Sequence, residues 1–319
     1  MDDIEGLTIE HQVYVCGSDI LCIFLPSGRE QNAISTYPRL GWRKKLPGLD
    51  LLYLADPFQH VEEFKTIGGS WFIDLKGESV LPSLGEVLRK HIKRSGYRKT
   101  ILYGSSMGGY AAIILGSMIN NAHAIAECPQ LYLERYPTSN HVISTFCSEE
   151  QREQLPNPVS ALLEDTNSSS FTIVANAFDQ HHISEHVLPL MNLLLTKVDS
   201  FKSRIQFHFY INDNYPRNHS ALWLDDAIHL IQQAQGAEAV SEAALLRSQI
   251  NQLEAQVASL SAQNKALGVR LEEIEASKFT KLARLYYRLA QSWPFRTFYR
   301  PSLQRKKRNS DHKPRSSQQ

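Results

Sequence analysis

Ser106 stands at the centre of a short run that places a nucleophilic hydroxyl between glycines, Gly104-Ser105-Ser106-Met107-Gly108. Mostly apolar residues lead into this run (100–103) and follow it (110–115), which predicts a strand before the turn and a helix after it. A Cβ atom at Gly104 or Gly108 would collide with the neighbouring element in so sharp a turn. The pattern is typical of a nucleophile elbow, in which strained backbone angles hold the serine hydroxyl at a helix N-terminus. The alternative is a glycine-rich turn without catalysis. Ser105 lies one position before the centre of the motif, so we expect it to take no part in catalysis.

A serine hydroxyl is a weak nucleophile until a base takes its proton, so a histidine and a carboxylate are needed beside it. His219 follows the last predicted strand, 205–211, and is predicted to be the general base and later the general acid. Asp179 follows the predicted strand 171–176 and is predicted to hold the imidazole in its productive tautomer. The order serine, acid, histidine is the one that accompanies a nucleophile elbow. Asp213 is too close to His219 in sequence for the usual position of the acid.

An oxyanion hole for the tetrahedral intermediate needs two backbone N–H groups. One is predicted at Met107, directly after the nucleophile. The other is predicted in the loop after the early strand 20–26, at Gly28 or Ser27. The alternative for Gly28 is an ordinary turn, because glycine is common in turns for conformational reasons alone.

No metal and no organic cofactor is expected. His181, His182 and His186 follow Asp179 closely, but no matching distant carboxylate motif accompanies them, so we expect a solvated loop rather than a metal site. His208 is expected to be a packed or hydrogen-bonded sheet residue. The cysteines at positions 16, 22, 128 and 147 are widely spaced and form no CxxC pair, which argues against a zinc site and a disulfide framework.

Strands and helices are predicted to alternate around these groups, which indicates an α/β fold with a doubly wound, mainly parallel sheet of about seven or eight strands. The predicted strands are 12–16 and 20–26, joined by a turn at 17–19, then 49–55, 70–75, 100–104, 122–127, 171–176 and 205–211. The predicted helices are 80–95, 107–118, 184–198 and 221–234. The proline-rich stretch 130–170 is too long for a plain connection and is expected to be a small cap. Residues 1–236 are thus expected to form one catalytic domain.

A heptad pattern follows in residues 241–277. Positions a and d carry Ile250, Leu253, Val257, Leu260, Asn264, Leu267, Leu271 and Ile274, and Leu246 extends the pattern backwards. β-Branched residues at two a sites, one asparagine at a and leucine at three d sites favour a parallel dimer, so we predict a homodimer through the coiled coil 243–277. The alternative is a single amphipathic helix packed on the domain.

The last segment, 278–319, is strongly basic: it holds 12 Lys or Arg residues and one acid, whereas residues 1–277 hold 22 Lys or Arg and 32 Asp or Glu. Within 278–308, aromatic and leucine side chains alternate with the basic ones, which is typical of a helix on an anionic membrane surface. A plain solvated tail is the second interpretation, and RNA binding, a less favoured one, is the third. No secretory signal and no apolar membrane-spanning stretch is present, so we expect a cytoplasmic protein, peripheral at the inner face of the membrane.

The order of the Ser27-Gly28 loop, the Ser106 elbow, Asp179 and His219 resembles that of the α/β-hydrolase superfamily, over residues 10–235. Within it, the run Gly104-Ser105-Ser106-Met107-Gly108-Gly109-Tyr110 with Cys128-Pro129-Gln130 resembles hydrolases found beside bacterial surface-polysaccharide genes, and is similar to the catalytic part of accessory secretion proteins that acetylate glycans on exported adhesins. The C-terminal segments are similar to tails of bacterial glycosyltransferases that build such polysaccharides. One departure is the histidine-rich run directly after Asp179.

The resemblance implies an acyl ester on a sugar as substrate. Together with the predicted triad it leads us to expect a serine esterase that deacylates a glycan or a small ester. Another hydrolase, such as a peptidase or a thioesterase, would use the same serine acyl-enzyme chemistry and is a further alternative. An O-acetyltransferase acting on a bacterial surface glycan is the first alternative, because only the acceptor of the acyl group differs. A non-catalytic scaffold that recruits partners to a membrane is the second.

Overall fold

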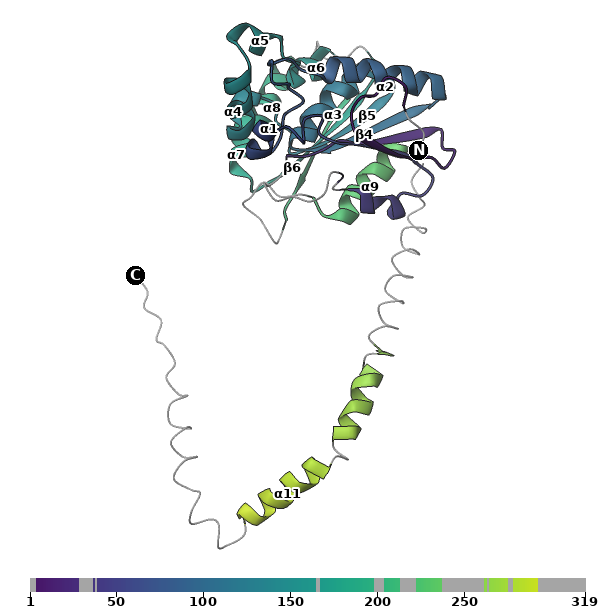
Figure 1. Ribbon diagram of the computed structural model, residues 1–319, viewed down its shortest axis with the longest axis vertical. Helices are drawn as coiled ribbons and strands as arrows, with labels where there is room; N and C mark the ends of the chain where they lie inside the picture. Colours follow the sequence, from purple (N-terminus) through teal and green to yellow (C-terminus); the bar gives the residue numbers. More distant parts are fainter. Residues whose placement is uncertain are drawn as a thin grey trace, which may run out of the picture. The chain divides into compact units, whose positions relative to one another are not determined.

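The computed structural model describes residues 4–28, 37, 39–164, 167–197, 204–212, 222–236, 261–262, 264–274 and 278–291 (Figure 1). The chain divides into two compact units, Met1–Ala239 and Val240–Gln319. Every residue of the predicted site lies in the first unit.

Seven strands form one sheet among the described residues, in the order β1-β3-β2-β4-β5-β6-β7. They are β1 (His11–Tyr14), β2 (Ile20–Phe24), β3 (Asp50–Leu54), β4 (Lys99–Ser105), β5 (Ala122–Glu127), β6 (Ser170–Asn176) and β7 (Arg204–Tyr210). β1 pairs with β3 in antiparallel fashion and every other pairing is parallel. The predicted mainly parallel sheet is therefore confirmed.

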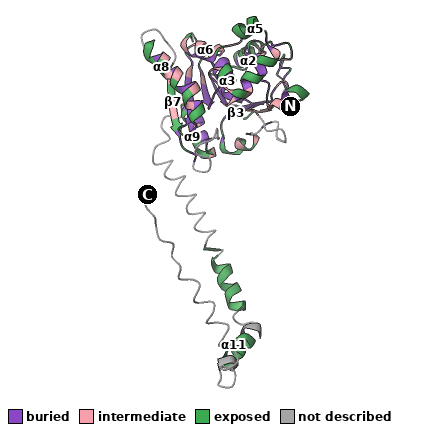
Figure 2. Cartoon of the chain, turned by 90° about the vertical axis from the view of Figure 1, so that its left-hand side faces the viewer, coloured by how far each residue is buried: buried purple, intermediate pink, exposed green. Residues whose placement is uncertain are grey.

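Helices cover both faces of this sheet (Figure 1). One face carries α2 (Leu81–Ser95) and α3 (Met107–Met118), and the other carries the 3₁₀ helix η1 (Leu40–Lys45) and α9 (Leu224–Gln235). Successive residues of one strand point into the two cores on opposite faces of the sheet. On β4, Leu102 packs in the core on the α3 face, whereas Ile101 and Tyr103 pack in the core on the α9 face. The central strands β2 to β6 are mostly buried on both faces and are largely apolar, and the middle of the sheet is purple in Figure 2, whereas the edge strands β1 and β7 are more exposed.

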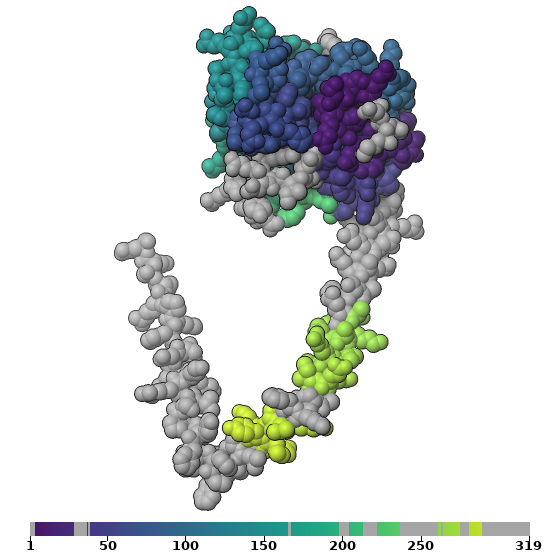
Figure 3. All heavy atoms as spheres, in the orientation of Figure 1, coloured from purple at the N-terminus to yellow at the C-terminus, as the bar shows by residue number. Residues whose placement is uncertain are grey.

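The predicted cap, 130–170, is mainly helical. It contains η2 (Leu133–Arg135), α4 (Pro137–Phe146), α5 (Glu149–Gln154) and α6 (Pro158–Glu164). Val142 and Leu162 are fully buried in the same core as α3, so this segment is packed onto the domain through a shared core. Phe146 also packs against Phe64 of α1 (Glu62–Ile67), with ring centroids 4.9 Å apart. Figure 3 shows the teal surface of the cap beside the blue surface of the segment around α1.

The turn at 17–19 joins β1 to β2, but these two strands do not pair with each other, because β3 lies between them, and the N–H groups of residues 16–18 bind the Asp50 carboxylate of β3. One expectation about this region is corrected. Residues 70–75 do not form a strand: only an isolated bridge joins Ile73 to Ser79. Trp71 and Phe72 have φ angles of 50° and 59°, which an extended strand cannot accommodate.

The remaining elements follow β6. They are α7 (Gln180–His182), the π-helical turn η3 (Ile183–Val187) and α8 (Leu188–Thr196). In the second unit, residues 264–274 are helical and α11 spans Lys278–Gln291. The predicted heptad positions 246, 250, 253, 257 and 260 lie outside the described residues. No described helix combines the length and apolar character needed to cross a bilayer.

Candidate active site

Ser106 lies between β4 and α3 with φ 54° and ψ −117°, the kind of strained conformation that the motif predicts. A Cβ atom at position 104 would lie 2.1 Å from the carbonyl oxygen of Gly108, and one at position 108 would lie 2.6 Å from that of Pro26. Both glycines are therefore required by close backbone approach. The Ser106 N–H donates to the carbonyl of Glu127 on the adjacent strand (2.8 Å), which fixes the turn at the carboxyl edge of the sheet.

The hydroxyl of Ser106 has one side-chain partner that the sequence reasoning did not assign to the site. Gln130, fully buried just beyond the end of β5, donates from Nε2 to Ser106 Oγ over 2.9 Å. The signal that could have identified it is topological: β5 is parallel to β4, and the carboxyl ends of neighbouring parallel strands meet at one edge. Residues shortly after β5 are therefore expected beside the elbow.

The side chain of Met107 lies near the loop that contains Gly28. A Cβ atom at Gly69 would lie 2.9 Å from Met107 Sδ and 3.5 Å from Gly28 Cα, so the Met107 thioether and the Gly28 backbone both lie beside Gly69. Met107 is the first residue of α3, where backbone N–H groups have no helical acceptor and anionic charge is favoured. A Cβ at Gly28 would itself lie 3.3 Å from the Gly68 carbonyl oxygen. Little space remains beside this loop.

Asp179 lies at the same edge of the sheet, after β6, and is buried. Its Oδ1 accepts from the His182 N–H (3.0 Å), so the carboxylate caps α7. Its charge is close enough to Tyr136 to help burial raise the pKa of that phenol. This contact fixes one carboxylate oxygen of Asp179, and its role as the acid of the triad stays a prediction.

His219 lies outside the described residues, within the segment 213–221. Both flanks of that segment meet groups next to Ser106. Before it, the Tyr210 hydroxyl lies 3.7 Å from Cys128 Sγ. After it, the Leu222 N–H donates to Glu127 Oε1. The role of His219 as the base stays a prediction.

A buried ion pair underlies the elbow. Arg39 Nη2 lies 3.5 Å from Glu127 Oε2 and donates to the Ser105 hydroxyl over 2.8 Å. The Tyr103 hydroxyl also donates to Glu127 Oε2 (2.8 Å), and burial together with the Glu127 charge raises the pKa of that phenol well above its usual value. Ser105 thus participates in a structural network, separate from the Ser106 hydroxyl. Neither Arg39 nor Glu127 was singled out from the sequence.

The expectation of a solvated loop around the histidines is wrong for two of them. His182 and His186 are buried, with ring centroids 5.4 Å apart, whereas His181 is exposed. His182 Nε2 lies 2.9 Å from the carbonyl oxygen of Pro129, directly before the cap, and His186 Nδ1 accepts from the N–H of Tyr132 in the cap, so the two histidines connect α7 and η3 to the start of the cap. In the part of the chain that the structure describes, no cluster of three or more His, Cys, Asp or Glu side chains could hold a metal ion. His208 is half-buried on the outermost strand, β7.

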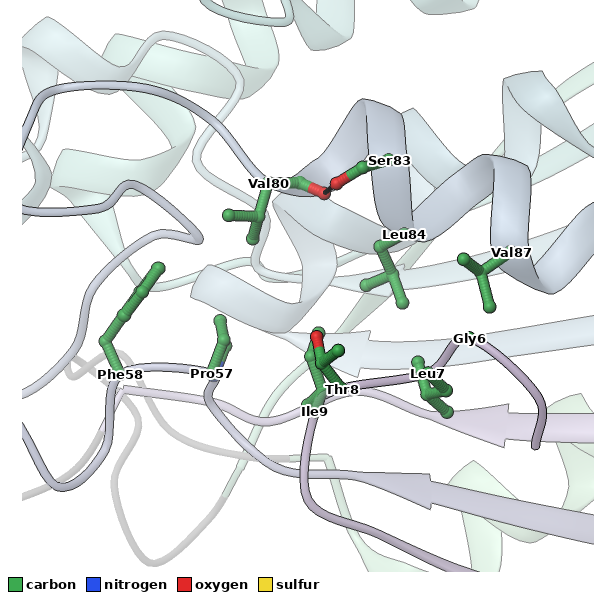
Figure 4. A pocket seen from close by; sticks show the side chains of 10 residues that line it. All are labelled: Gly6, Leu7, Thr8, Ile9, Pro57, Phe58, Val80, Ser83, Leu84 and Val87. Carbon is green, nitrogen blue, oxygen red and sulfur yellow. Dashed lines mark hydrogen bonds between the residues drawn. The ribbon is translucent and has the colours of Figure 1, made fainter. Parts of the chain in front are cut away.

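A cavity of about 300 Å³ opens between the N-terminal segment and α2 (Figure 4). Its lining is apolar except for the hydroxyls of Thr8 and Ser83, and the Ser83 hydroxyl donates to the Val80 carbonyl. No residue of the predicted triad lines it, and no ionisable side chain does. This cavity is therefore not equipped for acyl transfer.

A second cavity, of about 290 Å³, lies within the cap. It begins at Leu131 and Tyr132, directly after Gln130, and its lining includes Asn140, Arg152 and Glu153. These side chains can donate and accept hydrogen bonds.

No protein-family model and no curated protein sequence matches the chain. Solved structures do. The capsule O-acetyltransferase of Neisseria meningitidis serogroup A is 18% identical with a TM-score of 0.50, over 70% of this chain and 91% of that chain. A histidine-to-alanine variant of the same protein, in complex with CoA, is 17% identical with a TM-score of 0.50, over 70% and 90%. A post-proline cleaving enzyme from Rickettsia typhi is 14% identical with a TM-score of 0.49, over 72% and 35%. At this level of identity the likeness concerns the fold.

Proposed function

We propose that this chain, which has the α/β-hydrolase fold, is a serine acyl-transfer enzyme with Ser106 as nucleophile. The observation that carries the proposal is the strained backbone of Ser106 at the first turn of α3. Strain of this kind persists only where the surrounding structure enforces it, and here two glycines and the Glu127 carbonyl do so.

In the proposed mechanism, His219 takes the proton of Ser106 as Oγ attacks the carbonyl carbon of an acyl ester. The carbonyl oxygen becomes an oxyanion, which the N–H groups of Met107 and Gly28 stabilise. The intermediate then collapses: the bond to the alcohol breaks, His219 returns the proton to the departing oxygen, and an acyl-enzyme remains. Asp179 holds the imidazole and stabilises its protonated form.

The acyl-enzyme can pass its acyl group to water or to a sugar hydroxyl. Transfer to water makes the chain an esterase. Transfer to a sugar makes it an O-acetyltransferase, and the fold neighbour named for that activity, which aligns with this chain over 91% of its own length, supports this second candidate. The hydrogen-bonding side chains of the cap cavity suit a hydroxylated acceptor.

The test is hydrolysis of p-nitrophenyl acetate together with labelling by a fluorophosphonate probe. We expect the wild type to turn over and label, and Ser106→Ala to do neither. Ser105→Ala is the matched control, because it removes a neighbouring hydroxyl that binds Arg39 rather than Gln130, and it should still label. A folded wild type that neither turns over nor labels would contradict the proposal and favour the scaffold.

A second experiment separates the two acceptors. Purified protein is incubated with acetyl-free capsular oligosaccharides and acetyl-CoA, a thioester donor from which the CoA thiol leaves in place of the alcohol. In a separate reaction it is incubated with acetylated oligosaccharides alone, and the products of both are analysed by mass spectrometry. Acetylated oligosaccharide that depends on Ser106 would establish the transferase. Rapid hydrolysis of acetylated oligosaccharide without transfer would establish the esterase.

The second unit is proposed to localise this activity. A homodimer through 243–277 would bring two catalytic domains together, and the basic helix within 278–308 would hold them at an anionic membrane surface. Leu267 and Leu271, at predicted heptad positions, are 61% and 62% exposed, and Leu282 and Leu285 of α11 are 68% and 61% exposed. Burial of such side chains supplies the driving force for both associations.

A further inference from the structure

Two side chains form a hydrogen-bonded chain that ends on the proposed nucleophile. The indole Nε1–H of Trp71 donates to Gln130 Oε1 over 3.2 Å, and Gln130 Nε2 donates to Ser106 Oγ over 2.9 Å. Trp71 is 2% exposed and Gln130 is fully buried. Neither belongs to the triad or to the oxyanion loop.

The chemistry of the indole fixes the direction of this chain. An indole N–H can only donate, so the amide of Gln130 must turn its oxygen toward Trp71. Its NH₂ group therefore faces Ser106, and Ser106 Oγ has to accept from it. Because one lone pair of Oγ is occupied in this way, the Ser106 proton must point in another direction.

We propose that Gln130 positions the Ser106 hydroxyl for proton transfer, and that Trp71 fixes Gln130 in the orientation this requires. The inference rests on the proposed function and deepens it. The same Gln130 N–H remains a donor when negative charge develops on Oγ, both as the proton leaves and as Oγ departs in deacylation. Hydrogen bonds to charged groups are stronger than those to neutral ones, so the contact strengthens in the transition state and favours the chemical step over binding.

Trp71 is itself held firmly. It has a left-handed backbone conformation (φ 50°), and its N–H lies 3.2 Å from Met107 Sδ. The preceding Ser70 donates from its hydroxyl to the buried Asp56 carboxylate over 2.6 Å. The indole also lies against Gly69, where a Cβ would be 3.5 Å from its Cζ3. One rigid side chain therefore orients Gln130 and supports the loop at Gly28.

The test uses Gln130→Met, Gln130→Glu and Trp71→Phe in the full chain. Gln130→Met has a similar volume and no donor, so kcat for p-nitrophenyl acetate and the fluorophosphonate labelling rate should fall about 10- to 100-fold, with KM nearly unchanged. Trp71→Phe should give a smaller loss of about 3- to 10-fold, because Gln130 remains but can reverse its amide. The double variant should be no slower than Gln130→Met alone.

Gln130→Glu provides a readout that a packing role would not change. Its ionised carboxylate would accept the Ser106 proton and turn it away from the base, whereas the protonated acid could donate to Oγ. The ratio of its kcat to that of the wild type should therefore rise as the pH falls. A ratio independent of pH would overturn the proposal.

Labelling at the wild-type rate by folded Gln130→Met would also overturn it. If Gln130→Met fails to fold, the test rests on Trp71→Phe, which leaves Gln130 in place. Labelling of Trp71→Phe at the wild-type rate would then overturn the proposal. Failure of the proposed function is distinguishable, because then the wild type itself would not label.

Discussion

The backbone N–H of Leu222 donates to the buried carboxylate of Glu127, and the carbonyl of Glu127 accepts from the N–H of Ser106. One residue at the end of β5 thus connects the elbow to the chain that follows the predicted base. The Arg39 guanidinium compensates the charge of this carboxylate, and their side chains are 9% and 2% exposed. A buried ion pair therefore belongs to the network that joins Ser106 to Leu222.

We expect Glu127→Ala to lower the free energy of unfolding by about 3–5 kcal/mol, because it leaves the Arg39 cation buried without its counter-charge. Arg39→Ala should be similarly costly, and the double variant should cost clearly less than the two single losses added together. Urea unfolding of the four proteins gives this coupling. Additive losses would show that Arg39 and Glu127 act independently.

Activity should be lost in Asp179→Asn and His219→Asn without loss of the fold. Asparagine at 179 keeps a side-chain oxygen for the His182 N–H, so α7 keeps its cap while the charge that supports the imidazolium disappears. We expect kcat on p-nitrophenyl acetate to fall about 10³- to 10⁶-fold in both, by analogy with other triads. Wild-type turnover by folded Asp179→Asn would show that another residue serves as the acid of the triad.

His123 should make the fold sensitive to acid. Burial, aided by the nearby Lys99, lowers the pKa of His123 to about 4, and its ring nitrogens lie 2.7 and 3.0 Å from the hydroxyls of Ser170 and Thr172. The unfolded chain takes up this proton near pH 6.5, so it binds more protons than the native state between about pH 6.5 and 4. Stability contributed by neutral His123 is full above this window and is lost as the pH falls through it, by up to about 3 kcal/mol.

Urea unfolding at several pH values measures this loss. His123→Gln keeps a side chain that can bind both hydroxyls but cannot be protonated, so its stability should fall less steeply below pH 6.5 than that of the wild type. Parallel curves for the two proteins would contradict the prediction.

The membrane proposal predicts that the two faces of α11 differ. Leu282, Leu285 and Tyr286 follow helical spacing on one face, whereas Tyr287 lies with the basic residues on the other. Tyr286→Ser should weaken co-sedimentation with vesicles containing phosphatidylserine by about 10-fold or more, since burial of such a side chain is worth about 1.5–3 kcal/mol. Tyr287, which is similarly exposed, provides the matched control, and Tyr287→Ser should bind nearly as the wild type does. Equal binding of the wild type and a chain lacking 278–319 would eliminate the proposal.

The heptads predict a dimer that one charge can break. Leu267→Asp places a carboxylate at a d position in the proposed interface, so light scattering should show a monomer where the wild type is a dimer. Ala266→Asp introduces the same charge at the neighbouring position, which faces away, and should leave the dimer intact. A monomeric wild type would refute the coiled coil directly.

The sequence by itself determined the local features of the site. The strand, turn and helix around Ser106, the need for glycine at 104 and 108, and the carboxylate after β6 all follow from residue types at short range, because steric exclusion and hydrophobic periodicity act within a few residues. Mainly parallel pairing also followed, since strands that alternate with helices leave few other arrangements.

Only the tertiary structure decided which distant residues meet. The strand order that separates β1 from β2, the burial of His182 and His186 against the cap, the pairing of Arg39 with Glu127, and the chain from Trp71 through Gln130 to Ser106 join segments separated by up to 88 positions. Such contacts are selected by the packing of whole elements and by the need to pair buried polar groups. No single stretch of sequence carries that information.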